Sequence, residues 1–135
     1  PRNKTDEQIK LLAQKGGVFG CTFWPQCLKK GPKSALSDYV DTIDYVVDLV
    51  GINYAAIASD FCMNRTKTEL QKFQGGRAKP WWTVDLDWPV VMPEGLRDAG
   101  DYPNITAELV KRGYSERDIT KILGGNFIRL FEQAW

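Results

Sequence analysis

The amino-acid sequence predicts an α/β domain with parallel strands, and three observations support this prediction. Two short apolar runs, 18–24 (Val-Phe-Gly-Cys-Thr-Phe-Trp) and 54–58 (Tyr-Ala-Ala-Ile-Ala), lack the polar alternation of a half-exposed strand. Such runs are typical of strands that are covered on both faces. Amphipathic helical patterns precede, separate and follow them, as in parallel α/β folds. The composition, with 43% hydrophobic and 26% charged residues, is that of an ordinary globular domain.

The first helix is predicted to begin at a capping box. Thr5 is the expected N-cap, and Gln8 is placed to return the second bond of the box. Gly16 and Gly17 are expected to end this helix before the first strand.

The segment between the two strands is predicted to hold a loop and a second helix. Residues 25–33 contain two prolines and a glycine, which favours a loop. The helix is expected over about 37–50, with Ser37 as its N-cap and Gly51 as its stop. Its apolar stripe is formed by Leu36, Val40, Ile43, Val47 and Val50, spaced three and four residues apart.

The second half of the chain is predicted to begin with an insertion and to end in helices. Residues 64–92 show no clean period, and a loop of this length in a compact domain is usually functional or inserted. A helix is expected from Asn104 to about residue 111, closed by Gly113, and another from a capping-box-like start at Ser115. Two glycines at 124–125 are expected to interrupt that helix before a last segment over 126–133.

The predicted elements are too few for a complete parallel fold. At 135 residues the chain fits one domain, but two strands leave the edges of a parallel sheet uncovered. A complete (β/α)8 barrel takes about 250 residues. We therefore expect the chain to form part of a larger α/β domain.

Charge and hydropathy exclude two classes of function. Net charge is +1, from 18 basic and 17 acidic residues that are scattered along the chain. A nucleic-acid-binding protein would present a basic face, so no nucleic-acid partner is expected. No run of about 18 apolar residues is present, so no membrane-spanning segment is expected.

The absence of histidine restricts the chemistry further. Without histidine the chain cannot form a Ser-His or Cys-His dyad or, by itself, the common zinc sites. The three cysteines, Cys21, Cys27 and Cys62, lack the spacing of a disulfide framework or a zinc knot. They favour a reducing, cytoplasmic compartment, with Cys21 as a small core residue.

Two residues are candidates for a site. Asp60 directly follows the second predicted strand, where the working residues of α/β barrels lie, although an aspartate there can equally cap a loop. Arg2 precedes the first helix and could hold a carboxylate with its planar fork, although a lone arginine near the first residue is usually solvated. The cluster of Trp81, Trp82 and Trp88 favours pinning of the long loop over an aromatic wall above a site.

Six short motifs, in order and in register, resemble the last third of membrane dipeptidases, the renal dipeptidase family of the amidohydrolase superfamily. They are Arg2-Asn3 with Thr5-Asp6, Ser59-Asp60-Phe61, Pro93-Glu94-Gly95-Leu96, Tyr102-Pro103 through Glu108-Leu109, Lys111 through Glu116, and Gly125 through Phe131. The resemblance implies a (β/α)8 TIM barrel in which 18–24 and 54–58 are strands seven and eight. The insertion at about 64–92 stands outside it.

The resemblance also implies an activity and roles for the two candidates. The family cleaves dipeptides at a binuclear zinc centre. Asp60 matches its catalytic aspartate, which handles the proton of the metal-bridging hydroxide, and Arg2 matches the arginine that grips the substrate's carboxylate. The zinc ligands of the family, a His-x-Asp pair, a glutamate and two histidines, would lie upstream of Arg2.

One departure and one alternative accompany this interpretation. Where the family reads Asp-Phe-Asp-Gly, this chain has Asp60-Phe61-Cys62-Met63, which leaves its substrate preference open. The expected partners are a dipeptide substrate and the remaining N-terminal part of the barrel, and a homodimer stays open. The alternative is a non-catalytic fragment or paralogue that binds a partner through the tryptophan-rich insertion.

Overall fold

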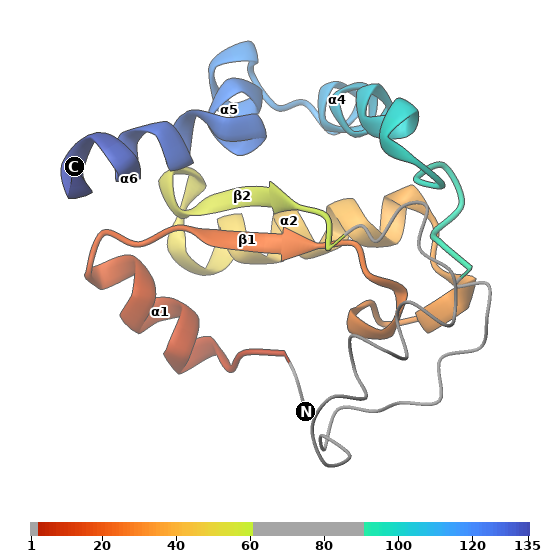
Figure 1. Cartoon of the computed structure of the whole chain (residues 1–135), viewed down its shortest axis with the longest axis horizontal. Coiled ribbons are helices and arrows are strands. Elements are labelled where there is room, and N and C mark those ends of the chain that lie inside the picture. Colours follow the sequence, from red (N-terminus) through yellow and green to blue (C-terminus); the bar gives the residue numbers. More distant parts are fainter. Residues whose placement is uncertain (1–2, 61–90) are drawn as a thin grey trace.

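The fold was analysed in a computed structural model, which describes residues 3–60 and 91–135. Two strands and several helices follow one another along these residues (Figure 1). The chain runs α1 (Asp6–Gln14), β1 (Phe19–Thr22), α2 (Leu36–Val50), β2 (Ala55–Ala58), α4 (Tyr102–Lys111), α5 (Glu116–Thr120) and α6 (Asn126–Ala134). Short 3-10 turns occupy Pro25–Cys27, Gly31–Lys33, Ile52–Tyr54 and Ala99–Asp101, and one π-helical turn occupies Lys121–Gly125.

The two strands are parallel, as predicted. Phe19 pairs with Ala55, and the register continues to Thr22 and Ala58. Helix α2 connects the strands and lies behind them in Figure 1, so it covers one face of the pair. The fold is therefore a mixed α/β arrangement in which both strands end at the same edge.

The core lies between the strand pair and the helix that connects its strands. Tyr39, Val40 and Ile43 of α2 are fully buried. The Tyr39 ring meets Phe23 edge to face with ring centroids 5.2 Å apart, and its hydroxyl donates to the Cys21 carbonyl at 3.0 Å. Burial raises the pKa of the Cys21 thiol to about 12, so this cysteine is neutral and acts as a small core residue, as predicted.

The helix starts confirm two predicted caps and correct a third. Thr5 forms the predicted capping box with Gln8, and Ser115 caps α5 by accepting from the Asp118 amide at 3.2 Å. Ser37 is not the cap of α2, because the helix begins at Leu36 and the Asp38 carboxylate accepts from the Ala35 amide at 2.9 Å.

Helix α4 begins at Tyr102 rather than at Asn104. Pro103 does not prevent this earlier start, because a proline in the first turn of a helix loses no intrahelical hydrogen bond. Asn104 therefore lies inside the helix, and its side chain donates to the Gly95 carbonyl at 3.1 Å. The predicted interruption at 124–125 is confirmed as the π-helical turn before α6.

Helices α2 and α4 are joined by an ionic cluster around Arg112. Its guanidinium donates to Asp41 at 2.7 Å, to Glu108 at 3.1 Å and to the Ser37 carbonyl at 2.8 Å, and it also contacts Asp44. Most of the Arg112 side chain is buried, so these bonds are less screened than those of an exposed pair. The cluster fixes the end of α4 against α2.

Asn126 joins the last helix to the start of β2. This side chain is buried, and its amide nitrogen donates to the carbonyls of Ile52 and Ala55, both at 2.8 Å. Those carbonyls lie at the turn that leads into β2, so one side chain satisfies two backbone acceptors at the junction.

Replacing Asn126 by Ala is expected to lower the free energy of unfolding by about 1–3 kcal/mol, because two buried carbonyls lose their donor. Urea denaturation of the intact protein measures this change. Asn126→Asp is the matched control, because Asp has the shape of Asn but lacks its amide donor. At neutral pH it should destabilise the fold at least as much as Asn126→Ala, because it also adds a buried charge. If Asn126→Asp unfolds at the same urea concentration as the native protein, the two bonds do not hold the junction.

Candidate active site at the carboxyl edge of the strands

The edge at which β1 and β2 end is held together by Thr22. Its hydroxyl donates to the Ser59 carbonyl at 3.3 Å and accepts from the Trp24 amide at 3.2 Å. One side chain thus ties the residues that follow β2 to the last residue of β1. The Trp24 side chain is itself buried, which fixes the start of the loop after β1.

Asp60 lies two residues beyond β2 at this edge, as predicted. Its side chain is exposed, and its backbone has a φ of +56°, in the left-handed region. Asp is among the few non-glycine residues that adopt this conformation readily. The positive φ turns the chain away from the strand direction directly after Ser59. Asp60 is therefore placed at the end of the strand by a sharp turn, which suits either of the two roles predicted for it.

The segment before α1 approaches the same edge. The side-chain amide of Asn3 donates to the Cys27 carbonyl at 3.1 Å, and Cys27 lies in the turn that follows β1. In Figure 1 α1 runs back toward the side where the strands start, so the segment before it lies nearer the side where they end. Arg2 itself lies outside the described residues, as do Trp81, Trp82 and Trp88.

The donor groups of the described residues do not fit a zinc centre. Residues 3–60 and 91–135 hold no group of three histidine, cysteine or carboxylate side chains that could bind a metal ion. The whole sequence contains no histidine, which is the commonest protein ligand of catalytic zinc. Asp60 at the strand edge is a single carboxylate, and a catalytic zinc site needs about three protein ligands.

We predict that the isolated 135-residue chain has no dipeptidase activity and no tight zinc site, because it offers too few ligands in one place. Isothermal titration of the chain with zinc, after removal of bound metal, measures this. Stoichiometric binding with a submicromolar Kd would contradict the prediction. The variant Asp60→Asn then serves as the control, since a loss of that binding would place the ion at the strand edge.

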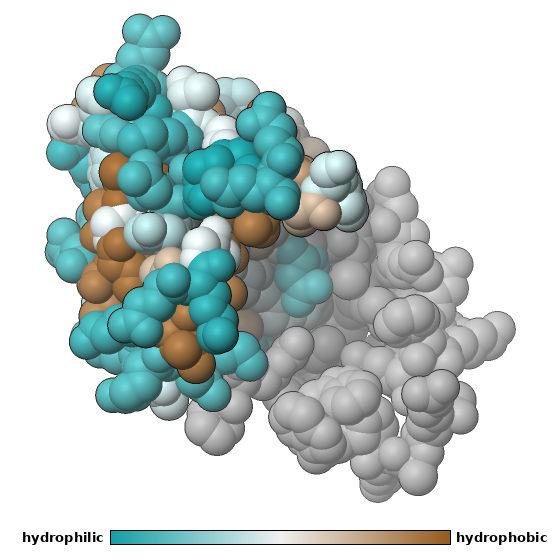
Figure 2. Space-filling view, turned by 90° about the vertical axis from the view of Figure 1, so that its left-hand side faces the viewer, coloured by the Kyte–Doolittle hydropathy of each residue, from teal (hydrophilic) through white to brown (hydrophobic). Residues whose placement is uncertain are grey.

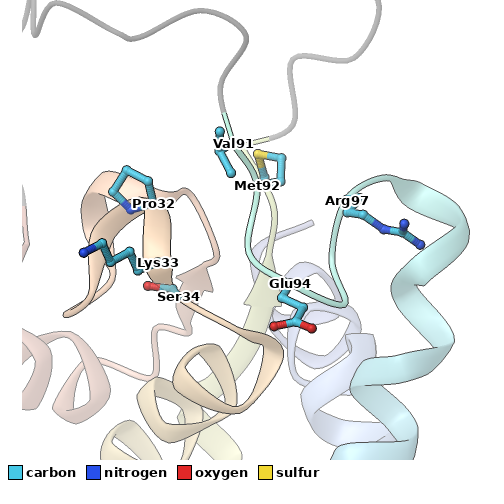
Figure 3. Close-up of a pocket in the computed structure, with 7 residues that line it drawn as sticks. All are labelled: Pro32, Lys33, Ser34, Val91, Met92, Glu94 and Arg97. Carbon is cyan, nitrogen blue, oxygen red and sulfur yellow. The ribbon is translucent and has the colours of Figure 1, made fainter.

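A hollow of about 490 Å³ lies between the loop before α2 and the segment before α4 (Figure 3). Backbone bonds join its two walls, from the Glu94 amide to the Ser34 carbonyl at 3.0 Å and from the Leu36 amide to the Glu94 carbonyl at 2.7 Å. In Figure 3 the charged ends of Lys33 and Arg97 point away from each other. The charged groups thus do not converge on one ligand, and no sequence motif indicated this hollow.

A second hollow, of about 450 Å³, is acidic and lies beside the Arg112 cluster. Asp44 lines it, but this carboxylate already accepts from the Tyr114 hydroxyl at 2.7 Å and contacts Arg112. These interactions explain the acidic residues as parts of a structural network. The edge with Asp60 is therefore the best-supported candidate site among the described residues.

Comparison with known proteins identifies the family. The family model for membrane dipeptidases, peptidase family M19, matches residues 1–75 and 84–135. The chain belongs to this family. The resemblance inferred from the six motifs is thereby confirmed. The unmatched residues, 76–83, lie within the insertion predicted at about 64–92, which stays a prediction.

Similar proteins in this family include curated dipeptidases and solved structures. A dipeptidase of Aspergillus terreus is 29% identical over 136 residues, which are 99% of this chain and 27% of that protein. The crystal structure of an amidohydrolase from Pseudomonas aeruginosa is 34% identical with a TM-score of 0.87, covering 100% of this chain and 41% of its own. A metallopeptidase from Rhodobacter sphaeroides, solved with a phosphinate mimic of the dipeptide L-Ala-D-Ala, is 20% identical with a TM-score of 0.73, covering 99% of this chain and 32% of its own.

This member of the membrane dipeptidase family spans only part of its relatives' length. Nearly all of this chain aligns with each of three curated relatives, but the aligned part is only 25%, 42% and 27% of their lengths. Among the helices of the described residues, none has the length and apolar character needed to cross a bilayer.

Proposed function

We propose that this chain is the C-terminal part of a metal-dependent dipeptidase with a (β/α)8 barrel. In this proposal β1 and β2 are strands seven and eight, and an N-terminal part supplies the other six. The parallel register of β1 and β2, with α2 on one face, supports this assignment. So does the family match together with the short share of each relative that the chain covers.

Asp60 is proposed as the catalytic aspartate, which exchanges a proton with the water that attacks the peptide carbonyl. The observation that carries the proposal is the position of Asp60, directly beyond β2 at the edge where both strands end, in a chain of a dipeptidase family. In (β/α)8 enzymes the residues that act on substrate lie at this edge. Asp60 is an exposed residue at this edge.

Arg2 is proposed to bind the C-terminal carboxylate of the dipeptide through two parallel hydrogen bonds. Support comes from its neighbour Asn3, which bonds to Cys27 in the turn after β1. That turn follows the edge at which Asp60 lies, so the chain beside Arg2 is held near the same edge. In this proposal Asp60, after β2, transfers the proton, and Arg2, before α1, binds the carboxylate of the substrate.

A binuclear zinc centre would have to be held by the N-terminal part. The donor groups within residues 3–60 and 91–135 do not fit such a centre, so we assign no ligand here and derive no step through the metal. The substrate class, a dipeptide, follows the family and agrees with the dipeptide mimic bound by the metallopeptidase from Rhodobacter sphaeroides.

The test is an assay of the complete protein that contains this chain. We expect it to hydrolyse at least some members of a panel of dipeptides with free termini, to lose this activity on treatment with a chelator and to regain it with added zinc. A blocked dipeptide with an acetylated and an amidated end is the control substrate. Absence of hydrolysis across the whole panel, with the protein folded and zinc supplied, would contradict the proposal.

A further inference from the structure

Helix α6 packs on the described part of the protein with its polar side. Arg129 donates to the Gly16 carbonyl at 3.5 Å and to the Asn53 carbonyl at 3.0 Å, and its guanidinium lies 5.9 Å from the Tyr54 ring centroid. Asn126, one turn earlier, is buried against the start of β2. A surface helix ordinarily turns its apolar side inward, so this orientation is the reverse of the usual one.

The apolar side of α6 is left exposed and is strongly aromatic. Phe127, Phe131 and Trp135 follow one another at intervals of four residues and stack, with ring centroids 6.1 Å and 5.3 Å apart. Phe131 is 47% exposed, Trp135 97%, and the neighbouring Ile128 59%. We call Phe127, Ile128, Phe131 and Trp135 the α6 stripe. Contiguous apolar surface of this kind marks a contact with another protein surface.

The stripe lies at the end of the molecule where the strands begin. The carbonyls of Gly16 and Asn53 accept from Arg129; Gly16 lies three residues before β1, and Asn53 lies in the turn that leads into β2. Figure 1 accordingly places α6 beside the tails of both strand arrows. Figure 2 views this end of the molecule and shows hydrophobic residues exposed between hydrophilic ones.

The first residue of the stripe also reaches the face of the strand pair opposite α2. The Phe127 ring lies 3.6 Å from the place that a Cβ at Gly20 would occupy. Side chains alternate between the faces of a strand, and the next residue, Cys21, points toward α2 and contacts the Thr42 carbonyl. Gly20 therefore lies on the face opposite α2, which is the inward face if the pair belongs to a barrel. The stripe starts on this face and continues beyond it.

We propose that the α6 stripe is the surface on which the N-terminal part of the same dipeptidase docks. There the stripe covers the starts of the remaining strands and closes that end of the barrel. This inference rests on the proposed function, because the proposed function assigns the other six strands to an N-terminal part. This chain covers only 25–42% of the curated relatives, and the rest of their length is enough for an N-terminal part that could cover the stripe. Its chemistry is an apolar rim of strand starts, because the stripe offers four hydrophobic side chains and no charge.

A second copy of the chain is the competing occupant, and the position of Phe127 speaks against it. A second copy seated on the whole stripe would have to extend over the face at Gly20, which is the interior of the barrel in the proposed fold. Docking of the N-terminal part uses the stripe and this face together.

The experiment measures the reaction of a maleimide with cysteines placed on α6. Phe131→Cys lies in the stripe, and Glu132→Cys, on the next residue and also exposed, is the matched control. Labelling is read at each position by mass spectrometry, so the native cysteines do not interfere. In the complete dipeptidase we expect the Phe131→Cys variant to react at least tenfold more slowly than the Glu132→Cys variant. Trp135→Cys replaces Phe131→Cys if that variant does not fold.

Each outcome decides for or against the inference. Slow labelling in the stripe that is unchanged over a hundredfold range of protein concentration supports docking of the N-terminal part. Equal labelling of the two variants overturns the proposal, and so does slow labelling that disappears on dilution, because it would indicate a second copy. Dipeptide hydrolysis by the same preparation is scored separately. A protected stripe without hydrolysis contradicts the proposed function alone, whereas hydrolysis with a reactive stripe contradicts this inference alone.

Discussion

Replacing Asp60 by Asn in the complete dipeptidase is expected to lower kcat by a factor of about 10² to 10⁴, the usual scale of general acid–base catalysis. Asn has the shape of Asp but cannot accept a proton at neutral pH. The turn after β2 should survive the change, because Asn also adopts the left-handed backbone conformation that Asp60 has. KM for the dipeptide should change little, since the substrate is held by other groups. Steady-state kinetics with a dipeptide that the native enzyme cleaves well give both constants.

Asp48→Asn is the matched control for this experiment. Asp48 is exposed near the end of α2, at the opposite end of the strand pair from Asp60, and losing its charge should leave kcat unchanged. Thermal unfolding of both variants checks that neither has lost its fold. If kcat of the Asp60→Asn variant falls less than about threefold, Asp60 only turns the chain after β2, which is the structural role that its place in the sequence also allowed.

The position of Asp60 could be predicted because strand ends are a local property of the sequence. The apolar run before it indicated a buried strand, and the polar Ser59 marked where the strand stops. The parallel pairing followed from the lack of polar alternation in both runs, since strands covered on both faces are typical of parallel sheets. Thr5 and Ser115 were found for a similar reason, because a cap and its partner lie within one helical turn.

Contacts between residues far apart in the sequence could not be predicted in this way. Asn3 reaches Cys27 across 24 residues, and no local pattern links them. The α6 segment was expected as a helix, but periodicity shows only that one side of it is apolar. Which side packs on the body depends on Asn126 and Arg129, whose acceptors are more than 70 residues away. The reversed packing of α6 therefore appeared only in the structure.

The peptide bond that is cleaved and the C-terminal carboxylate of the substrate are assigned to different residues, so variants of Asp60 and Arg2 should change different kinetic constants. Arg2→Lys keeps the positive charge but loses the planar two-pronged donor, so the substrate's carboxylate is held by one bond in place of two. We expect KM for a dipeptide with a free C-terminus to rise about tenfold or more, with kcat changing much less. That rise corresponds to the loss of roughly 1.4 kcal/mol of binding, within the usual range for a hydrogen bond to a charged group. Asp60→Asn should do the opposite and lower kcat while KM changes little.

Amidation of the substrate's C-terminus turns the Arg2 prediction into a cycle of two enzymes and two substrates. The amide carries no charge and cannot accept both arms of the arginine. It should therefore cost the native enzyme about tenfold more in kcat/KM than it costs the Arg2→Lys variant, which has already lost most of the contact. The coupling free energy is the difference between the two ratios, and it isolates the contact from any general effect of either change. Lys4→Arg, the reverse exchange two residues further along the chain, controls for an unspecific effect of exchanging lysine and arginine in this segment and should show the native response. If amidation lowers kcat/KM equally in the native enzyme and in the Arg2→Lys variant, Arg2 does not bind the carboxylate, and another group of the complete enzyme must do so.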